Sequence, residues 1–178
     1  MKKHILDWLI TAACVVLVGL WAYRTFIAPH GRPPVSSGWS PPGAQAKLPS
    51  VKLWLGSQEL AAEVASTRDE IQTGLMFRTN LASNDAMLFA LPVPQRAEFY
   101  MRNTLIPLSC AYIDEDGVIL ETHDMKPRDE TVIPSATATV RYVLEVNRGW
   151  FESNHVAAGT VVRTEQGPLR KSLREAPY

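Results

Sequence analysis

The stretch Phe99–Asp114 constrains the fold of this chain more than any other. Two strand-like apolar runs flank a break at residues 103–107, which places Asn103, Thr104 and a proline between segments that otherwise look buried. Polar side chains enclosed by apolar sequence need hydrogen-bond partners or a function. The stretch therefore predicts two β-strands separated by a polar corner.

Short strand-like runs recur on both sides of this stretch, and turn signals such as Gly56-Ser57 separate them. They cover residues 51–55, 58–64, 86–91, 97–102, 108–114, 118–124, 139–147 and 160–163. Thr67 and Glu70 form the capping box of one short helix, and residues 149–152 look like a helical turn. This pattern predicts a mainly β domain over residues 50–165, a jelly-roll-like sandwich or a distorted barrel with one short helix.

An apolar run precedes this domain. Residues 1–4 form a short basic start, and residues 8–23 are uncharged, with tryptophan and tyrosine near both ends. With Ile5 and Leu6, the uncharged run approaches the roughly 20 residues that span a bilayer as a helix. The run predicts a single transmembrane signal anchor in the inner (cytoplasmic) membrane. Residues 1–4 would lie in the cytoplasm and the C-terminal domain outside it, with membrane lipid as the partner of residues 5–27.

Three alternatives to an uncleaved anchor fit the sequence less well. A signal peptide needs a small-x-small cleavage site, and Trp21–Arg24 is a poor one. A lipoprotein site at Cys14 would follow an apolar run that Asp7 interrupts. A buried soluble helix would show an amphipathic face, and none is visible over this length.

The segments on either side of the domain differ from it in composition. Residues 28–49 are rich in proline, glycine and serine, which predicts an extended linker that holds the domain away from the membrane. Residues 166–178 are charged and contain two prolines, which predicts a flexible tail.

Charge and motifs narrow the possible functions. Lysine and arginine (18) equal aspartate and glutamate (18), so the composition predicts no nucleic-acid partner. A metal site would have to use His123 with Glu121 and Asp124 or His155, but the His-x-His, HExxH and cysteine-cluster patterns are absent, so we expect no metal. Phosphate-cradling glycine motifs are also absent, and we expect no cofactor.

Nucleophilic catalysis would use Ser109 or Cys110 with His123 as the base. Cys110 lies in a strand that is apolar on both sides, where it would pack as a small hydrophobic side chain. No Gly-x-Ser-x-Gly elbow accompanies Ser109. The sequence therefore assigns no catalytic residue and leans against an enzyme.

Polar side chains that could bind a ligand fall into two groups. Alternation along residues 118–124 and 139–147 places Glu121, His123 and Glu145 on polar faces, which would form one patch if these two strands are neighbours. The other group, at corners of the fold, consists of Arg78, Asn103, Thr104 and Asn147, and backbone capping is the competing explanation for it. The tentative ligand-binding residues are Arg78, Asn103, Thr104, Glu121, His123, Glu145 and Asn147.

Four sequence blocks resemble the family catalogued as domain of unknown function 192. They are Gly74–Arg78, Met87–Phe89, Phe99–Leu108 and Leu144–Phe151. The resemblance covers about residues 51–162 and implies a compact, mainly β fold carried by exported or membrane-tethered bacterial and archaeal proteins. It supplies no established activity. The chain departs from the family pattern at Tyr100, where the family usually has Trp, and at Ser109, where it usually has an acidic residue.

Three functions compete on this evidence. The first is a membrane-tethered envelope domain that binds a small ligand, a glycan or a protein partner. The second is a hydrolase-type enzyme with an unrecognised site built from Arg78, Asn103, Glu121, His123 and Glu145. The third is an accessory subunit of a membrane complex, in which the N-terminal helix contacts its partners.

Overall fold

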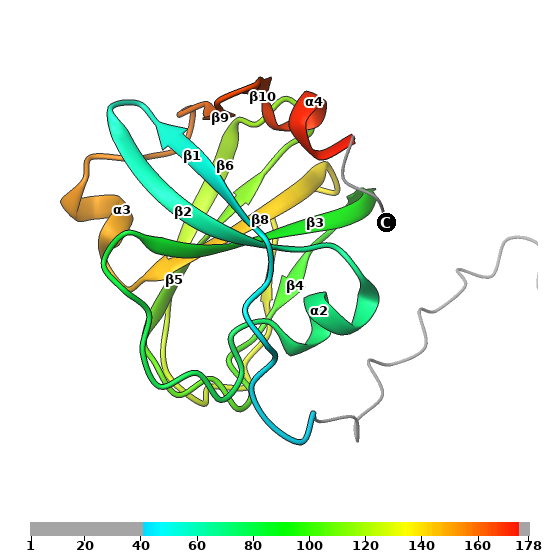
Figure 1. Ribbon diagram of the computed structural model, residues 1–178, viewed down its shortest axis with the longest axis vertical. Coiled ribbons are helices and arrows are strands. Elements are labelled where there is room, and N and C mark those ends of the chain that lie inside the picture. Colours follow the sequence, from blue (N-terminus) through cyan, green and yellow to red (C-terminus); the bar gives the residue numbers. More distant parts are fainter. Residues whose placement is uncertain (1–40, 175–178) are drawn as a thin grey trace, which may run out of the picture. The chain divides into compact units, whose positions relative to one another are not determined.

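One mixed β-sheet organises residues 41–174, the part of the chain that this computed structural model describes (Figure 1). Its eight strands lie in the order β10-β9-β1-β2-β3-β8-β5-β6. Their bounds are β1 Ser50–Leu55, β2 Gln58–Ala65, β3 Asp85–Gln95, β5 Leu108–Ile113, β6 Ile119–Met125, β8 Val140–Asn147, β9 Val162–Thr164 and β10 Gly167–Pro168. The short strands β4 (Glu98–Phe99) and β7 (Ile133–Pro134) pair separately.

Three short helices lie at separate places around the sheet (Figure 1). They are α2 (Arg68–Thr73), α3 (Trp150–Ser153) and α4 (Leu169–Arg174). The capping box at the start of α2 is confirmed, because the Glu70 amide donates to the Thr67 hydroxyl at 3.3 Å and the Thr67 amide donates to the Glu70 carboxylate at 2.9 Å. The prediction of one short helix is wrong in number, because the described residues form three short helices.

The sheet is mixed because its connections differ in length. Turns join β1 to β2 and β5 to β6 as antiparallel hairpins, as predicted. In contrast, β2 and β3 are parallel, because the segment that contains α2 carries the chain back across the sheet. An isolated bridge between Val118 and Val161 links the residue before β6 to the residue before β9. The domain is mainly β, as predicted, but the sheet is not a closed barrel.

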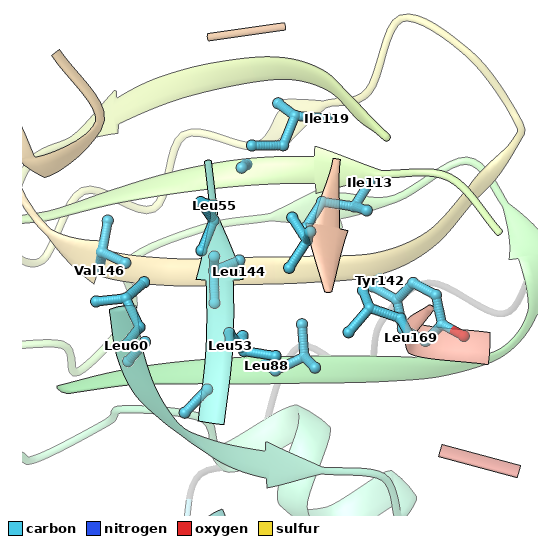
Figure 2. Packing of buried hydrophobic residues seen from close by; sticks show 14 of the residues in the cluster. Leu53, Leu55, Leu60, Leu88, Ile113, Ile119, Tyr142, Leu144, Val146 and Leu169 are labelled. Carbon is cyan, nitrogen blue, oxygen red and sulfur yellow. The ribbon is translucent and has the colours of Figure 1, made fainter. Parts of the chain in front are cut away.

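Buried clusters cover both faces of the central part of the sheet. Figure 2 shows the cluster on one face, where side chains from several strands pack together, among them Leu53, Leu88, Leu144 and Val146. A second cluster on the other face includes Met87, Phe89, Cys110, Tyr112 and Met125. All six residues of β5 are consequently buried. Burial on both faces explains why β5 is apolar throughout instead of alternating.

The C-terminal end of the predicted linker contacts the domain. The Gln45 side-chain amide donates to the Gly74 carbonyl at 2.8 Å, and the Leu48 amide donates to the Glu63 carboxylate at 2.8 Å. The predicted anchor, residues 5–27, lies outside the described residues, as does most of the predicted linker. Within residues 41–174, no helix is long and apolar enough to cross a membrane.

The predicted flexible tail begins as ordered structure. Gly167 and Pro168 form β10 beside β9, and α4 follows directly. Leu169 is 0% and Leu173 6% exposed, and both belong to the core. Residues four apart lie on one side of a helix, so this pair buries one face of α4, whereas Arg170 and Lys171 are exposed. The charged composition concealed that apolar pair.

Candidate functional site

A groove of about 380 Å³ lies where β8 leads into α3. Asn147, the last residue of β8, lines it and is one of the sequence-predicted site residues. The groove is lined by Leu81, Ser83, Asn147, Arg148, Gly149, Trp150, Ser153 and Asn154. Its volume falls within the range of small-molecule sites, about 300–1,000 Å³.

Two local features shape this groove. The Asn147 side-chain amide donates to the carbonyls of Leu81 at 3.1 Å and Ala82 at 2.9 Å, which fixes the turn before β3 against the end of β8. Gly149 then adopts φ 76°, a left-handed conformation that glycine enters without steric cost. The turn at Gly149 directs the chain into α3. Two segments distant in sequence therefore form the two walls.

A hydrogen-bonded chain supports the wall that carries Arg148. The Ser109 hydroxyl donates to the Asp124 carboxylate at 2.5 Å and accepts from the Gly149 amide at 2.9 Å. The other oxygen of Asp124 accepts from Arg148 Nε at 3.3 Å. Ser109 is 2% exposed, whereas the Arg148 side chain is 46% exposed. The chain of contacts thus runs from a buried strand to an exposed cation.

Arg78 lies in a different part of the domain and is paired. Its guanidinium contacts both carboxylate oxygens of Glu63, at 3.1 and 2.9 Å, and the two side chains are 15% and 8% exposed. Within the described residues, Arg78 Nε is buried without a hydrogen-bond partner. The geometry links the segment after α2 to β2.

Asn103 and Thr104 form a corner, as the sequence predicts. Asn103 has φ 55°, and its carbonyl accepts from the Phe77 amide at 2.8 Å. Thr104 is 5% exposed, and its carbonyl accepts from the Arg128 amide at 3.0 Å. The backbone of this corner therefore holds two other loops in place.

Glu121 and His123 contact each other on β6. His123 Nε2 lies 3.0 Å from a Glu121 oxygen, and the other Glu121 oxygen accepts from the Ala136 amide at 2.7 Å. Alternation along residues 118–124 predicts that Ile119 shares the face of Glu121 and His123, and this prediction is wrong. A register shift near Ile119 places its side chain in the first core cluster, whereas Glu121 lies opposite Tyr112 of the second.

Glu145 is separated from that pair by a whole strand. The predicted patch required the strands now labelled β6 and β8 to be neighbours, and this condition is wrong because β5 lies between them. Cys110 of β5 is opposite His123 on one side and Glu145 on the other. Glu145 is 5% exposed. Its burial raises its pKa to about 8.

The side chains considered for catalysis do not form an active nucleophile. Cys110 is 0% exposed, and burial raises the pKa of its thiol, with a smaller contribution from the charge of Glu145. The Ser109 hydroxyl donates to Asp124 and not to His123. In the described part of the chain, no three His, Cys, Asp or Glu side chains are placed to hold a metal ion.

Sequence reasoning missed most of the groove. The sequence patterns offer Asp124 only as a metal ligand, and they do not point to Arg148, Ser83, Ser153 or Asn154. Arg148 lies inside the block Leu144–Phe151, between Asn147 and Gly149. Its place in that block is a local signal that could identify it.

Comparisons with known proteins agree with the fold. The sequence model of the family DUF192, Uncharacterized ACR, matches residues 51–164. A solved structure from Sinorhizobium meliloti 1021, described as a proposed transcription regulator, is 29% identical with TM-score 0.63, covering 68% of this chain and 98% of that one. A protein of unknown function from Novosphingobium aromaticivorans DSM 12444 is 30% identical with TM-score 0.64, covering 75% and 99%. No curated protein matches the chain.

Proposed function

Since the chain belongs to the DUF192 family of uncharacterised proteins, we propose that its domain is a non-catalytic binding module for a small hydroxyl-rich ligand, a glycan in chemical class, which occupies the groove beside α3. The observation that carries this proposal is the convergence of polar groups from two distant segments on one groove. Ser83 comes from the turn before β3, and Asn147, Ser153 and Asn154 come from the end of β8 and from α3.

The chemistry of these groups fits a sugar. Hydroxyl side chains both donate and accept hydrogen bonds, as sugar hydroxyls do. The amide groups of Asn147 and Asn154 donate to backbone carbonyls, so these two side chains would accept from the sugar through their oxygens. Leu81 and Trp150 add apolar surface to the groove, which can cover the C–H faces of a ring. Arg148 supplies additional donors at the rim. The domain would bind by these contacts without a covalent step.

The setting of the module is also part of the proposal. We propose that residues 5–27 anchor the chain in the inner (cytoplasmic) membrane and that residues 28–49 present the domain outside the cytoplasm, where envelope glycans are within reach. Alkaline phosphatase fused after Tyr178 would then be active in cells, because this enzyme needs an oxidising compartment. Deletion of residues 2–27 should abolish the activity of the fusion. An active fusion after that deletion would contradict the anchor.

The binding proposal is tested with a groove-filling variant. The full-length chain in detergent is screened against trisaccharides of hexoses, hexosamines and uronic acids by saturation-transfer NMR, and the bound sugars are then titrated calorimetrically. Ser153→Tyr places a bulky ring in the groove and should weaken binding at least tenfold. Ser57→Tyr, on the exposed turn between β1 and β2, is the matched control. If no sugar binds, or if Ser153→Tyr binds as the wild type does, the proposal is wrong.

A further inference from the structure

We propose that the groove selects ligands that carry a carboxylate, and that Asp124 is the positioning residue that orients Arg148 to bind it. The inference rests on the proposed function, since it names the class of glycan that the same groove would take: an acidic sugar of the uronic acid type.

Charge is the first reason for this selection. Among the described residues that line the groove, Arg148 alone carries a charge. The other polar groups there are hydroxyls and amides, which suit the neutral part of a sugar. A planar guanidinium matches a carboxylate with two parallel hydrogen bonds, and such charge-assisted bonds are stronger than neutral ones. A ligand with one carboxylate among several hydroxyls is complementary to this set of groups.

Orientation is the second reason. Asp124 accepts from Arg148 Nε at 3.3 Å and thereby leaves the two terminal nitrogens of the guanidinium available to a ligand. Asp124 is itself held by the Ser109 hydroxyl at 2.5 Å, and Ser109 is fixed by the Gly149 amide at 2.9 Å. A side chain that is already ordered loses less entropy when a ligand binds. The contacts therefore prepare Arg148 for a ligand.

The number of charges favours carboxylate over phosphate. Asp124 and Arg148 form an ion pair, so their formal charges cancel and the guanidinium would hold an anion through its terminal N–H groups. Two parallel hydrogen bonds suit a carboxylate, whereas a phosphate dianion would need further cationic donors, and the described residues that line the groove supply none. A titration can therefore distinguish a sugar carboxylate from phosphate as the ligand of Arg148.

The test compares two ligands that differ only at carbon 6. The full-length chain is titrated with α-1,4-trigalacturonate, with α-1,4-galactotriose and with inorganic phosphate. We expect trigalacturonate to bind about tenfold more tightly than galactotriose, because a charge-assisted hydrogen bond at a half-exposed site contributes about one factor of ten. Phosphate should compete only weakly. Equal binding of the two sugars, or preferential binding of phosphate, would overturn the proposal.

The variants separate positioning from simple charge. Asp124→Asn removes a negative charge beside the groove, so a purely electrostatic role predicts tighter binding of trigalacturonate. Loss of the contact that orients Arg148 predicts the opposite, a ratio of acidic to neutral affinity that falls toward one. Asp116→Asn removes the same charge from an exposed turn and calibrates the long-range effect. A higher ratio in Asp124→Asn than in Asp116→Asn would overturn the role of Asp124.

Arg148→Gln keeps the test decisive if Asp124→Asn does not fold, and it should abolish the preference for the acidic sugar. If the preference survives in that variant, the proposal fails.

Failure of this inference and failure of the proposed function give different results. Galactotriose that binds in the groove as well as trigalacturonate leaves the binding module intact and removes its selectivity. If the screen finds no sugar that binds, both proposals fall.

Discussion

Arg78 and Glu63 form a two-point ion pair between the segment after α2 and the strand β2, with contacts of 3.1 and 2.9 Å. The same Glu63 carboxylate accepts from the Leu48 amide at 2.8 Å. One buried carboxylate therefore holds two segments on the sheet. This arrangement gives Arg78 a structural role that its position in the sequence did not reveal.

Breaking this pair should destabilise the domain strongly. Glu63→Gln leaves a mostly buried guanidinium without a counter-charge, and we expect a loss of about 3 kcal/mol in the free energy of unfolding, the lower end for buried pairs because Arg78 is partly exposed. The measurement is denaturant unfolding of the full-length chain in detergent, followed by tryptophan fluorescence.

The chain offers a matched exposed pair as the control. Lys52 and Glu59 are in contact at 3.0 Å, but their side chains are 45% and 53% exposed. Glu59→Gln should change the free energy of unfolding by less than about 1 kcal/mol, because water screens surface pairs. Equal effects of the two substitutions would refute the structural role of Glu63.

Glu145 should make the stability of the domain depend on pH. Its folded-state pKa, raised by burial to about 8, lies above the ordinary value of 4.5. Between these values the folded state holds a proton that the unfolded state has released. The contribution of Glu145 to stability is therefore fully present below pH 4.5 and is lost as the pH rises toward 8, with a slope of up to about 1.4 kcal/mol per pH unit.

Glu145→Gln should flatten this slope, since the amide is neutral at every pH. The measurement is the free energy of unfolding from pH 5 to 8, compared with the wild type. Glu98→Gln removes a carboxylate from an exposed position and serves as the control. A wild-type slope that persists in Glu145→Gln would show that another group carries it.

The Cys110 thiol should be unreactive in the folded domain. It is 0% exposed, and burial raises its pKa, so the thiolate that attacks disulfide reagents is scarce. A Cys14→Ser variant isolates Cys110, because the chain has two cysteines. We expect no reaction with a chromogenic aromatic disulfide under native conditions and one thiol per chain in denaturant. Rapid native labelling would contradict this burial.

Leu169 should anchor the C-terminal helix to the core. Its side chain is 0% exposed, and Leu169→Ala should cost about 2–4 kcal/mol through lost contacts and a residual cavity. Arg170→Ala changes the next, exposed residue and should stay within about 0.5 kcal/mol. The measurement is again denaturant unfolding. If Leu169→Ala behaves like Arg170→Ala, α4 does not contribute to the fold.

Local signals in the sequence predicted most of the elements. The capping box at Thr67 and Glu70, the hairpin signal at Gly56-Ser57 and the helical turn after Gly149 depend on residues close together in the chain, and each is present in the structure. The corner at Asn103 and Thr104 follows the same rule. Periodicity and turn chemistry are properties of short segments, so the sequence contains them directly.

Features that depend on distant partners could not be predicted in this way. Alternation predicts one patch for Glu121 and Glu145 if their strands are neighbours, yet strand order places β5 between these strands. The pairing of Arg78 with Glu63 and the contact of Asn147 with Leu81 are set by how strands pair, which alternation within one strand does not specify. The groove depends on these long-range contacts. Only Asn147 of its lining was therefore predicted.

The most direct test of the central claim is a map of the amide chemical shifts of the isotope-labelled full-length chain as an acidic trisaccharide is added. The account predicts that shifts concentrate on the groove, at Leu81, Ser83 and residues 147–154. It also predicts no change at the separate cavity of about 230 Å³ that Val51, Val64 and Leu173 line beside α4. Shifts confined to that cavity, or no saturable shifts at all, would contradict it.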